Sequence, residues 1–312
     1  MMDIIKPKAL KHGDTIGIAA PASPPATVEH LLRGIQYLER LGFRVELGKH
    51  LYNKTGYLAG SDRERASDLN ELFANKNVKA IFIARGGYGC TRILPLLNYR
   101  MIKRNPKIIV GYSDISALQL ALLRRTGLVS FSGPMVAVEM AGKFSGEAEE
   151  RFWRSVTSKA KPPTISIPLH DQRVVHPGKG EGVLFGGNLS LVASLVGTDY
   201  FPRLKNAILM LEEVGERPYR INRMLNQLKL SGVFKRLSGV ALGKFTGCEP
   251  EAGKPSLTLQ QVFEDSLQGY SIPVLGHIHN GHIDDIFTIP FGIRVRLDAN
   301  QKRLFFLENA VL

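Results

Sequence analysis

The sequence predicts an α/β protein of two domains, with a doubly wound parallel sheet first and a β-rich α+β domain after it. Short apolar runs alternate with amphipathic stretches from Thr15 to about Arg125, which is typical of parallel strands covered by helices. Between 159 and 181 the composition changes to Lys, Pro, Ser and His. We therefore expect an N-terminal domain at 1–158, a linker at 159–181 and a C-terminal domain at 182–312.

The N-terminal elements repeat a pattern of strand, turn and helix. The run Thr15 to Ala20 is typical of a buried strand, and the proline-rich segment that follows ends it. Val28 to Leu41 has apolar residues near i, i+3, i+4 and i+7, which predicts a helix that ends at Gly42. The same pattern predicts further strands at 43–47, 80–84 and 107–110, and further helices at 63–73 and 115–125.

The segment before the C-terminal half cannot form the interior of a helix. Pro162 and Pro163 are adjacent, and proline lacks the N–H that a helix interior requires. Beyond them short apolar runs dominate, so we expect mostly strands with two or three helices among them. These runs lie at 182–185, 207–211, 239–242, 288–290, 294–297 and 304–307.

Composition limits the class of protein and its partners. No stretch approaches the roughly 18 uninterrupted apolar residues of a membrane span, and the basic N-terminus has no apolar block, so we expect a cytoplasmic protein without a membrane partner. Cys90 and Cys248 lie too far apart in the chain to suggest a disulfide framework or a cysteine zinc site. The net charge of +13 fits an anionic partner or a solvated basic surface. Because the basic residues are dispersed and do not alternate with aromatic ones, we expect no nucleic acid.

Ser113 is the first candidate for chemistry. It follows a predicted buried strand and precedes a predicted helix whose first turn contains Asp114 and Ser116. A tight turn of this kind lifts the hydroxyl above the carboxyl edge of the sheet and directs helix N–H groups at the same space. The alternative is an ordinary helix cap, since serine and aspartate are common N-cap residues.

The glycine-rich turn from Arg85 to Gly89 supplies a second candidate feature. Three glycines after a strand allow the backbone to approach a ligand and present N–H donors to it. A plain turn and a phosphate-binding loop are alternatives, but the glycine spacing matches neither a dinucleotide fold nor a P-loop. Cys90, just beyond the turn, is a second possible nucleophile, although a small buried residue is the simpler interpretation.

A serine nucleophile needs a base and an acid that orients the base. The sequence offers His277, His279 and His282 in one turn, and the adjacent acids Glu212 and Glu213 at the end of a predicted strand. The three histidines, with two aspartates after them, also suggest a zinc or manganese site, and hence a metallohydrolase. From the residues alone, both alternatives stay open.

Together these motifs resemble the LD-carboxypeptidases, the muramoyltetrapeptide carboxypeptidase family, whose relatives include the microcin C self-immunity peptidases. The resemblance covers nearly the whole chain. It implies an N-terminal domain like that of class I glutamine amidotransferases and a β-rich C-terminal domain. The matching segments lie at 19–23, 85–89, 111–114, 131–135, 186–189 and 211–220, with Gly281 and His282 eight residues before Pro290.

The resemblance also implies a role for each matching residue. By position Ser113 is similar to the family nucleophile, Glu212 to the orienting acid and His282 to the general base. The backbone N–H groups of Gly87 and Asp114 correspond to the oxyanion hole. This chain has Glu213 where the family usually has aspartate after the catalytic glutamate.

The implied reaction is release of the terminal D-alanine from cytoplasmic peptidoglycan tetrapeptides during murein recycling. It requires neither a metal nor an organic cofactor, its partner is a small muropeptide, and the family suggests a homodimer. Three alternatives remain: a peptidase that cleaves a peptide-nucleotide antibiotic, as the microcin relatives do, the metallohydrolase, and a basic binding module without turnover. The antibiotic peptidases need an aromatic loop that holds the nucleotide, whereas Trp153, the single tryptophan, is interpreted as core packing.

Overall fold

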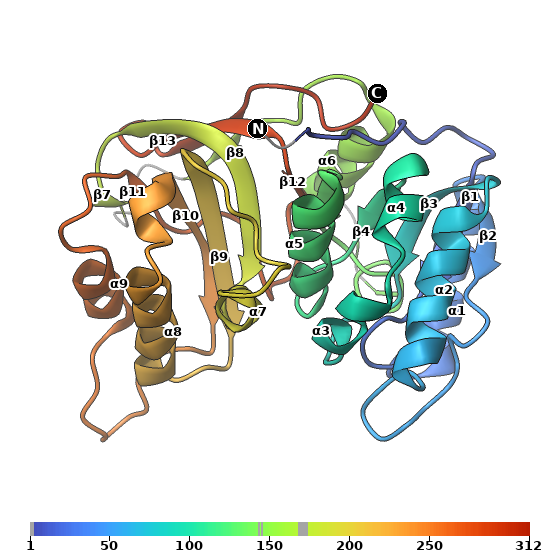
Figure 1. Ribbon diagram of the computed structural model, residues 1–312, viewed down its shortest axis with the longest axis horizontal. Coiled ribbons are helices and arrows are strands. Elements are labelled where there is room, and N and C mark those ends of the chain that lie inside the picture. The colour runs from blue at the N-terminus through green and yellow to red at the C-terminus, as the bar shows by residue number, and fades with distance from the viewer. Residues whose placement is uncertain (1–2, 143, 145, 168–173) are drawn as a thin grey trace.

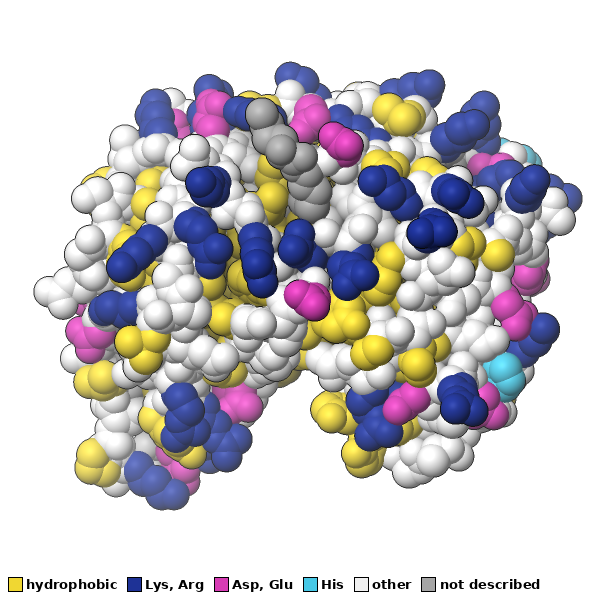
Figure 2. Space-filling view, in the orientation of Figure 1, with side chains coloured by type: hydrophobic (Ala, Val, Ile, Leu, Met, Phe, Trp, Pro, Cys, Tyr) yellow, Lys and Arg dark blue, Asp and Glu magenta, His cyan; other side chains and the backbone are white. Residues whose placement is uncertain are grey.

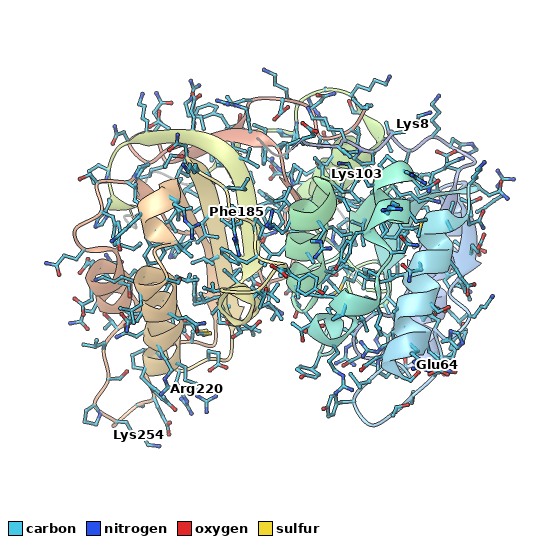
Figure 3. All side chains as sticks on the ribbon, viewed as in Figure 1. Lys8, Glu64, Lys103, Phe185, Arg220 and Lys254 are labelled. Atoms are coloured by element: carbon cyan, nitrogen blue, oxygen red, sulfur yellow. The ribbon has the colours of Figure 1, made fainter. Side chains whose placement is uncertain are left out.

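The protein folds into two domains that lie side by side, each built from a sheet with helices packed against it (Figure 1). The structure is a computed structural model, and it describes residues 3–142, 144, 146–167 and 174–312. One buried apolar cluster extends through both domains, and it includes Leu118 of the first and Phe185 of the second. Figure 3 labels Phe185 within the second domain. The domain boundary is therefore packed like a protein interior.

The first domain contains the parallel sheet that the sequence predicts. Strands β1 to β5 pair in parallel in the order β5-β4-β3-β1-β2, and β12 joins β5 in the antiparallel direction at the edge. All residues of the central strands β3 and β4 except Lys79 are buried, as expected of parallel strands with helices on both faces. The strands are β1 (Thr15–Ala19), β2 (Arg44–Leu47), β3 (Val78–Ile83), β4 (Ile108–Val110), β5 (Ser130–Ser132) and β12 (Ile289–Phe291).

Helices cover both faces of this sheet. Phe82 of β3 packs against Phe152 of α6, whereas its neighbour Ile81 belongs to a different buried cluster with α2 and α5. Thr27 and Ser61 begin α1 and α2, because each side chain accepts a hydrogen bond from a free N–H of the first turn. The helices are α1 (Val28–Arg40), α2 (Asp62–Ala74), α3 (Cys90–Ile93), α4 (Tyr99–Arg104), α5 (Ile115–Thr126) and α6 (Gly146–Thr157).

The second domain is built on a mixed sheet. Its strands lie in the order β6-β14-β13-β8-β9-β10-β11-β7, and the run from β8 to β11 is parallel. Parallel neighbours require crossover connections, and here α7, α8 and α9 provide them. The strands are β8 (Lys179–Asn188), β9 (Ala207–Val214), β10 (Leu237–Thr246), β11 (Val274–Leu275), β13 (Arg294–Asp298) and β14 (Arg303–Phe306), and the helices are α7 (Leu189–Leu195), α8 (Pro218–Leu230) and α9 (Leu259–Leu267).

This domain differs in one respect from the α+β arrangement that the sequence suggested. The expectation of many strands is confirmed, but helices alternate with the central strands and do not lie apart from them. The helices share a buried cluster with Leu209 and Leu211 of β9 and Leu242 of β10, so they cover one face of the parallel strands. The apolar runs at 207–211 and 239–242 predicted strands correctly but carried no information about their direction.

The segment between the domains contributes strands to the second sheet. Strand β6 (Ile165–Ser166), strand β7 (Val174–His176) and the start of β8 all fall within the stretch 159–181 that the sequence suggested as a linker. Strands of two or three residues, such as β6 and β7, are too short to show a periodic pattern. The sequence therefore gives no signal from which they could be predicted. Residues 168–173 of that stretch lie outside the described part of the chain. In the opposite direction, β12 leaves the predicted C-terminal domain and pairs with the first sheet.

No helix in the described part of the chain is long and apolar enough to cross a membrane. Lys and Arg side chains are spread over both domains in Figure 2, with acidic side chains among them. The same view shows the molecule hollowed between the two domains at its lower edge, on the side where β8 and β10 end in Figure 1.

Candidate active site

Ser113 lies in the short turn between β4 and α5. Its φ of 65° is in the left-handed region, which is uncommon for a residue other than glycine. The turn is fixed by hydrogen bonds from the Ile115 N–H to the Tyr112 carbonyl and from the Ser116 N–H to the Ser113 carbonyl. A strained backbone that is held in place like this is a common feature of functional sites. The tight strand-to-helix turn predicted from the sequence is therefore confirmed.

A chain of two hydrogen bonds links Ser113, His282 and Glu212. The His282 Nε2 atom lies 3.0 Å from the Ser113 Oγ atom, and the His282 Nδ1 atom lies 2.8 Å from the Glu212 Oε2 atom. Since an ionised carboxylate only accepts, Nδ1 carries the ring proton and Nε2 is left to accept from the hydroxyl. Glu212 comes from β9 and His282 from the loop between β11 and β12, so the second domain brings both to the serine of the first.

The environment of His282 favours its protonated form. Burial acts to lower the pKa of the imidazole, but the hydrogen bond and charge of Glu212, with smaller contributions from Glu213 and Glu139, raise it above its ordinary value. Glu212 is 2% exposed, and its other oxygen, Oε1, has no hydrogen-bond partner within the described part of the chain. The carboxylate therefore stabilises an imidazolium next to Ser113.

Glu213 points to the opposite face of β9, where it accepts hydrogen bonds from the end of β8 and the first turn of α7. Its carboxylate accepts hydrogen bonds from the Asn188 side chain at 2.8 Å and from the N–H and hydroxyl of Ser190 at 2.9 and 2.7 Å. Successive strand residues point to opposite faces, so only one of two adjacent glutamates can reach His282. In this geometry it is Glu212.

The glycine loop lies against the serine turn. Gly87 has a φ of 110°, and a Cβ atom there would lie 2.2 Å from the Ser23 hydroxyl, so neither the conformation nor the space admits a side chain. The Asp114 carboxylate accepts from the Cys90 N–H at 2.7 Å and ties the loop to the start of α5. In the described residues, the N–H groups of Gly87 and Asp114 donate to no other protein group. Both are thus available to a ligand.

Cys90 is fully buried. Burial, together with the nearby charge of Asp114, raises the pKa of its thiol well above the ordinary value. A protonated and inaccessible thiol is a poor nucleophile. The interpretation of Cys90 as a buried small residue is confirmed.

The three histidines of the turn point to different partners. The His277 ring lies 3.3 Å from the Lys244 ammonium, the His279 ring packs on Phe287 with centroids 4.5 Å apart, and His282 faces Ser113. Burial, followed by the charge of Lys244, lowers the pKa of His279. Across the described residues, no group of three or more His, Cys, Asp and Glu side chains is arranged to hold a metal ion. The three-histidine metal site suggested by the spacing does not form.

Tyr112 packs against His282 and is hydrogen-bonded to Glu139, and sequence reasoning assigned no role to either residue. The Tyr112 ring meets the imidazole edge to face with centroids 5.2 Å apart, and its hydroxyl donates to Glu139 at 2.7 Å. Glu139 also accepts from the Met135 N–H at 2.8 Å. Burial raises the pKa of both the Tyr112 phenol and the Glu139 carboxyl. Glu139 belongs to no sequence motif, so the sequence could not have marked it as part of the site. Tyr112 could have been marked, because it directly precedes Ser113.

The Gly-Gly-Asn segment of β8 joins the two domains beside the site. Gly187 has a φ of 127°, and a Cβ atom there would lie 2.3 Å from the Ser116 hydroxyl. The same hydroxyl accepts a hydrogen bond from the Asn188 N–H at 2.9 Å. This contact fixes the first turn of α5 against the second domain, which keeps the serine in register with its histidine.

Trp153 packs within the first domain. Its ring stacks on Phe43 with centroids 5.1 Å apart, and its Nε1–H donates to the Tyr37 hydroxyl at 2.7 Å. The prediction that this tryptophan serves core packing is confirmed.

Comparison with known proteins gives consistent matches along the chain. The family model described as "LD-carboxypeptidase N-terminal domain" matches residues 16–133, and "LD-carboxypeptidase C-terminal domain" matches residues 181–297. A "Probable murein peptide carboxypeptidase" of Bacillus subtilis is 39% identical, over 95% of this chain and 92% of that protein.

Two solved structures are similar over nearly the full length. The microcin C7 self-immunity protein MccF, in its wild-type apo state, has a TM-score of 0.88 at 28% identity, over 99% of this chain and all of that chain. A muramoyltetrapeptide carboxypeptidase of Oxalobacter formigenes has a TM-score of 0.83 at 30% identity, over 93% of this chain and 97% of that chain.

Proposed function

Because the chain belongs to the LD-carboxypeptidase family, we propose that it is a serine carboxypeptidase that releases the terminal D-alanine from murein tetrapeptides. The observation that carries the proposal is the hydrogen-bonded chain from Ser113 through His282 to Glu212. The family supplies the type of reaction, and the triad supplies a means of performing it. We propose further that the enzyme acts in the cytoplasm, as a homodimer.

In the proposed mechanism His282 takes the Ser113 proton while the hydroxyl oxygen attacks the carbonyl carbon of the terminal peptide bond. The charge of Glu212 stabilises the imidazolium, and the N–H groups of Gly87 and Asp114 bind the negative oxygen of the tetrahedral intermediate. His282 then gives its proton to the departing amine, and D-alanine leaves. A water molecule, deprotonated by His282, releases the tripeptide from Ser113 and restores the enzyme.

The proposal needs no metal or organic cofactor. The metallohydrolase alternative lacks support from the geometry, since only His282 of the three histidines faces the serine. Hydrolysis of a peptide-nucleotide antibiotic is the second candidate, and it is favoured by the similarity to the microcin C7 self-immunity protein. Trp153 gives it no aromatic platform, because its ring is stacked within the first domain.

The test uses a matched pair of disaccharide tetrapeptides that differ only in the configuration of the terminal alanine. Mass spectrometry should detect the shortened tripeptide product from the D-alanine substrate and little or none from its L-alanine twin. Added chelator should leave the rate unchanged. Absence of tripeptide, equal cleavage of both twins, or loss of activity with chelator would each reject the proposal. A peptide-nucleotide conjugate in a parallel reaction tests the second candidate.

A further inference from the structure

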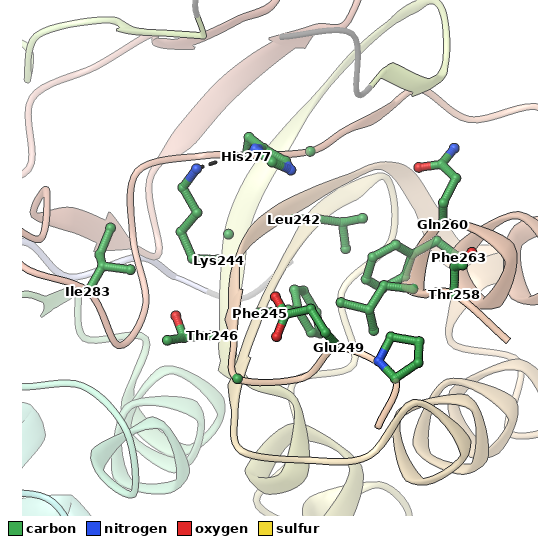
Figure 4. A pocket seen from close by; sticks show the side chains of 15 residues that line it. Leu242, Lys244, Phe245, Thr246, Glu249, Thr258, Gln260, Phe263, His277 and Ile283 are labelled. Carbon is green, nitrogen blue, oxygen red and sulfur yellow. Dashed lines mark hydrogen bonds between the residues drawn. The ribbon is translucent and has the colours of Figure 1, made fainter. Parts of the chain in front are cut away.

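Two cavities of similar size lie in different parts of the molecule. One, of about 800 Å³, lies at the carboxyl ends of β10 and β11 and is lined by Ile283, which directly follows His282, so it belongs to the site already described (Figure 4). The other, of about 750 Å³, lies at the amino edge of the first sheet. Lys107, which directly precedes β4, lines it, whereas Ser113 lies beyond the other end of the same strand. This second cavity is therefore separate from the active site.

The second cavity (the basic cavity) is lined by seven lysines and one acidic side chain, Asp14. The whole chain has 41 Lys and Arg residues against 28 Asp and Glu residues, so positive charge is concentrated in this cavity beyond the average of the chain. The fold brings these lysines together from four segments that are distant in sequence, at 6–11, 76–79, 107 and 159. Figure 3 labels one of them, Lys8, at the upper edge of the molecule, away from the hollow between the domains.

Most of these lysines lack a neutralising partner. Lys6 forms an ion pair with Glu308 at 2.6 Å, and none of the other six forms an ion pair with a described residue. The two carboxylates of the wall, on Asp14 and Leu312, accept hydrogen bonds from backbone N–H groups instead. The cavity thus has six unpaired ammonium groups against two carboxylates, which is a net positive charge. The six are Lys8, Lys11, Lys76, Lys79, Lys107 and Lys159.

Lys107 is the buried member of this group, at 5% exposed. Its ammonium donates to the backbone carbonyls of Asn75 and Val78, the second at 2.7 Å. Because an ammonium has three N–H donors, one of them is left without an acceptor among the described residues. Burial, followed by the charge of Lys79, lowers the pKa of Lys107 to about 8. An anion in the cavity supplies the missing acceptor and stabilises the charged form.

We propose that the basic cavity binds a small molecule that carries two or three linked phosphate groups. Lysine binds phosphate as a point charge, and its hydrogen bonds to an anion are among the stronger ones in proteins. Several ammonium groups around one cavity repel one another, and a ligand with several negative charges offsets this repulsion better than a monoanion does. The concave shape favours a small ligand over a membrane surface, because a flat bilayer would meet only the exposed lysines and would not reach Lys107.

Two sources supply this chemistry, an inorganic polyphosphate and a nucleotide. The volume of about 750 Å³ lies within the range of small-molecule sites and admits either one. Besides the lysines, the cavity is lined by the apolar residues Ala9, Val78 and Pro106. These residues can pack against a nucleoside, whereas an inorganic phosphate chain would leave them uncovered. The two sources therefore differ in whether a nucleoside adds to the affinity of the phosphate chain.

The test measures Kd by isothermal titration calorimetry for inorganic triphosphate, metal-free ATP and inorganic phosphate. The wild-type protein should bind triphosphate at least about 10-fold more tightly than phosphate, the effect of one additional charge-assisted hydrogen bond. The double variant Lys76→Gln/Lys159→Gln should weaken triphosphate binding by at least about 10-fold for the same reason. Lys205→Gln/Lys235→Gln is the matched control, because it removes the same charge from exposed lysines of the second domain, and it should keep the wild-type Kd.

Each outcome supports or overturns the inference. A lower Kd for ATP than for triphosphate supports it with a nucleotide as the ligand, and equal Kd values support it with an inorganic polyphosphate. Equal Kd values for triphosphate and phosphate, or the same loss of affinity in both double variants, would overturn it. So would binding to phosphatidylglycerol vesicles without binding to triphosphate, which would assign the lysines to a membrane surface. D-alanine release plays no part in the measurement, so the result does not depend on the proposed function.

Discussion

Replacement of Glu212 by Gln removes the charge behind His282 while keeping the size of the side chain. In the native site the Nδ1–H group donates to Oε2 at 2.8 Å, and Oε1 has no partner within the described part of the chain. If the amide oxygen faces His282, the buried NH₂ group takes the place of Oε1 and lacks an acceptor. If the NH₂ group faces His282, Nδ1 must accept, and Nε2 then carries the proton and cannot accept from Ser113.

Both orientations of the new amide raise the free energy of the transition state, because neither supplies the negative charge that stabilises the imidazolium. With the NH₂ group facing His282, the imidazole is also held in the wrong tautomer. We expect kcat to fall about 10⁴-fold, as for the comparable change in a serine protease, which corresponds to about 5.5 kcal/mol in activation free energy. The assay is D-alanine release from a tetrapeptide between pH 5 and 9. Circular dichroism checks that the variant is folded.

The pH dependence adds a second, independent readout. As the general base, His282 must be neutral, so activity rises as the pH increases through its pKa. Burial lowers that pKa and Glu212 raises it, with a net upward shift. Without the Glu212 charge the pKa falls, and the acid limb of the profile moves to lower pH. A variant with near-wild-type kcat, or with an acid limb that does not move or moves upward, would refute this role for Glu212.

Three further changes have expected outcomes. Gly87→Ala should lower kcat about 10²- to 10³-fold in the same assay, because the new Cβ atom would lie 2.2 Å from the Ser23 hydroxyl and displace an oxyanion donor; an unchanged kcat would exclude this N–H from the oxyanion hole. Cys90→Ala should keep activity, and iodoacetamide should not label the native thiol, since Cys90 is buried; loss of activity in a folded variant would reopen the thiol as a catalytic group. Glu213→Ala should lower the free energy of unfolding by about 1–3 kcal/mol in urea denaturation, because Asn188 and Ser190 lose their acceptor; unchanged stability would contradict its structural role.

The first domain could be predicted well because its signals are local. Buried strands such as Ile108–Val110 are continuous apolar runs, and the helices between them have a clear 3.6-residue period. The tight turn at Ser113 was predicted for the same reason, since it lies between two strong local patterns. The pairing of β12 with β5 could not be predicted, because it joins residues more than 150 positions apart.

In the candidate site, too, the residues with a local sequence signal could be predicted and those that depend on the three-dimensional structure could not. Local sequence marked Ser113 and the glycine loop, but it left two glutamates and three histidines as alternatives. The geometry separates them by strand alternation, which turns Glu212 toward His282 and Glu213 toward Asn188. Glu139 was out of reach of sequence reasoning, because its relation to Tyr112 depends on a turn that has no motif.

The central claim is that Ser113 performs the reaction with His282 and Glu212, and its most direct test is D-alanine release by Ser113→Ala. The account predicts that this variant folds, binds the tetrapeptide with an affinity close to the wild-type KM or tighter, and releases no D-alanine above the uncatalysed rate. Isothermal titration calorimetry measures the binding, and mass spectrometry of the same mixture measures the product. Release of D-alanine at the wild-type rate by a folded Ser113→Ala protein would contradict the account.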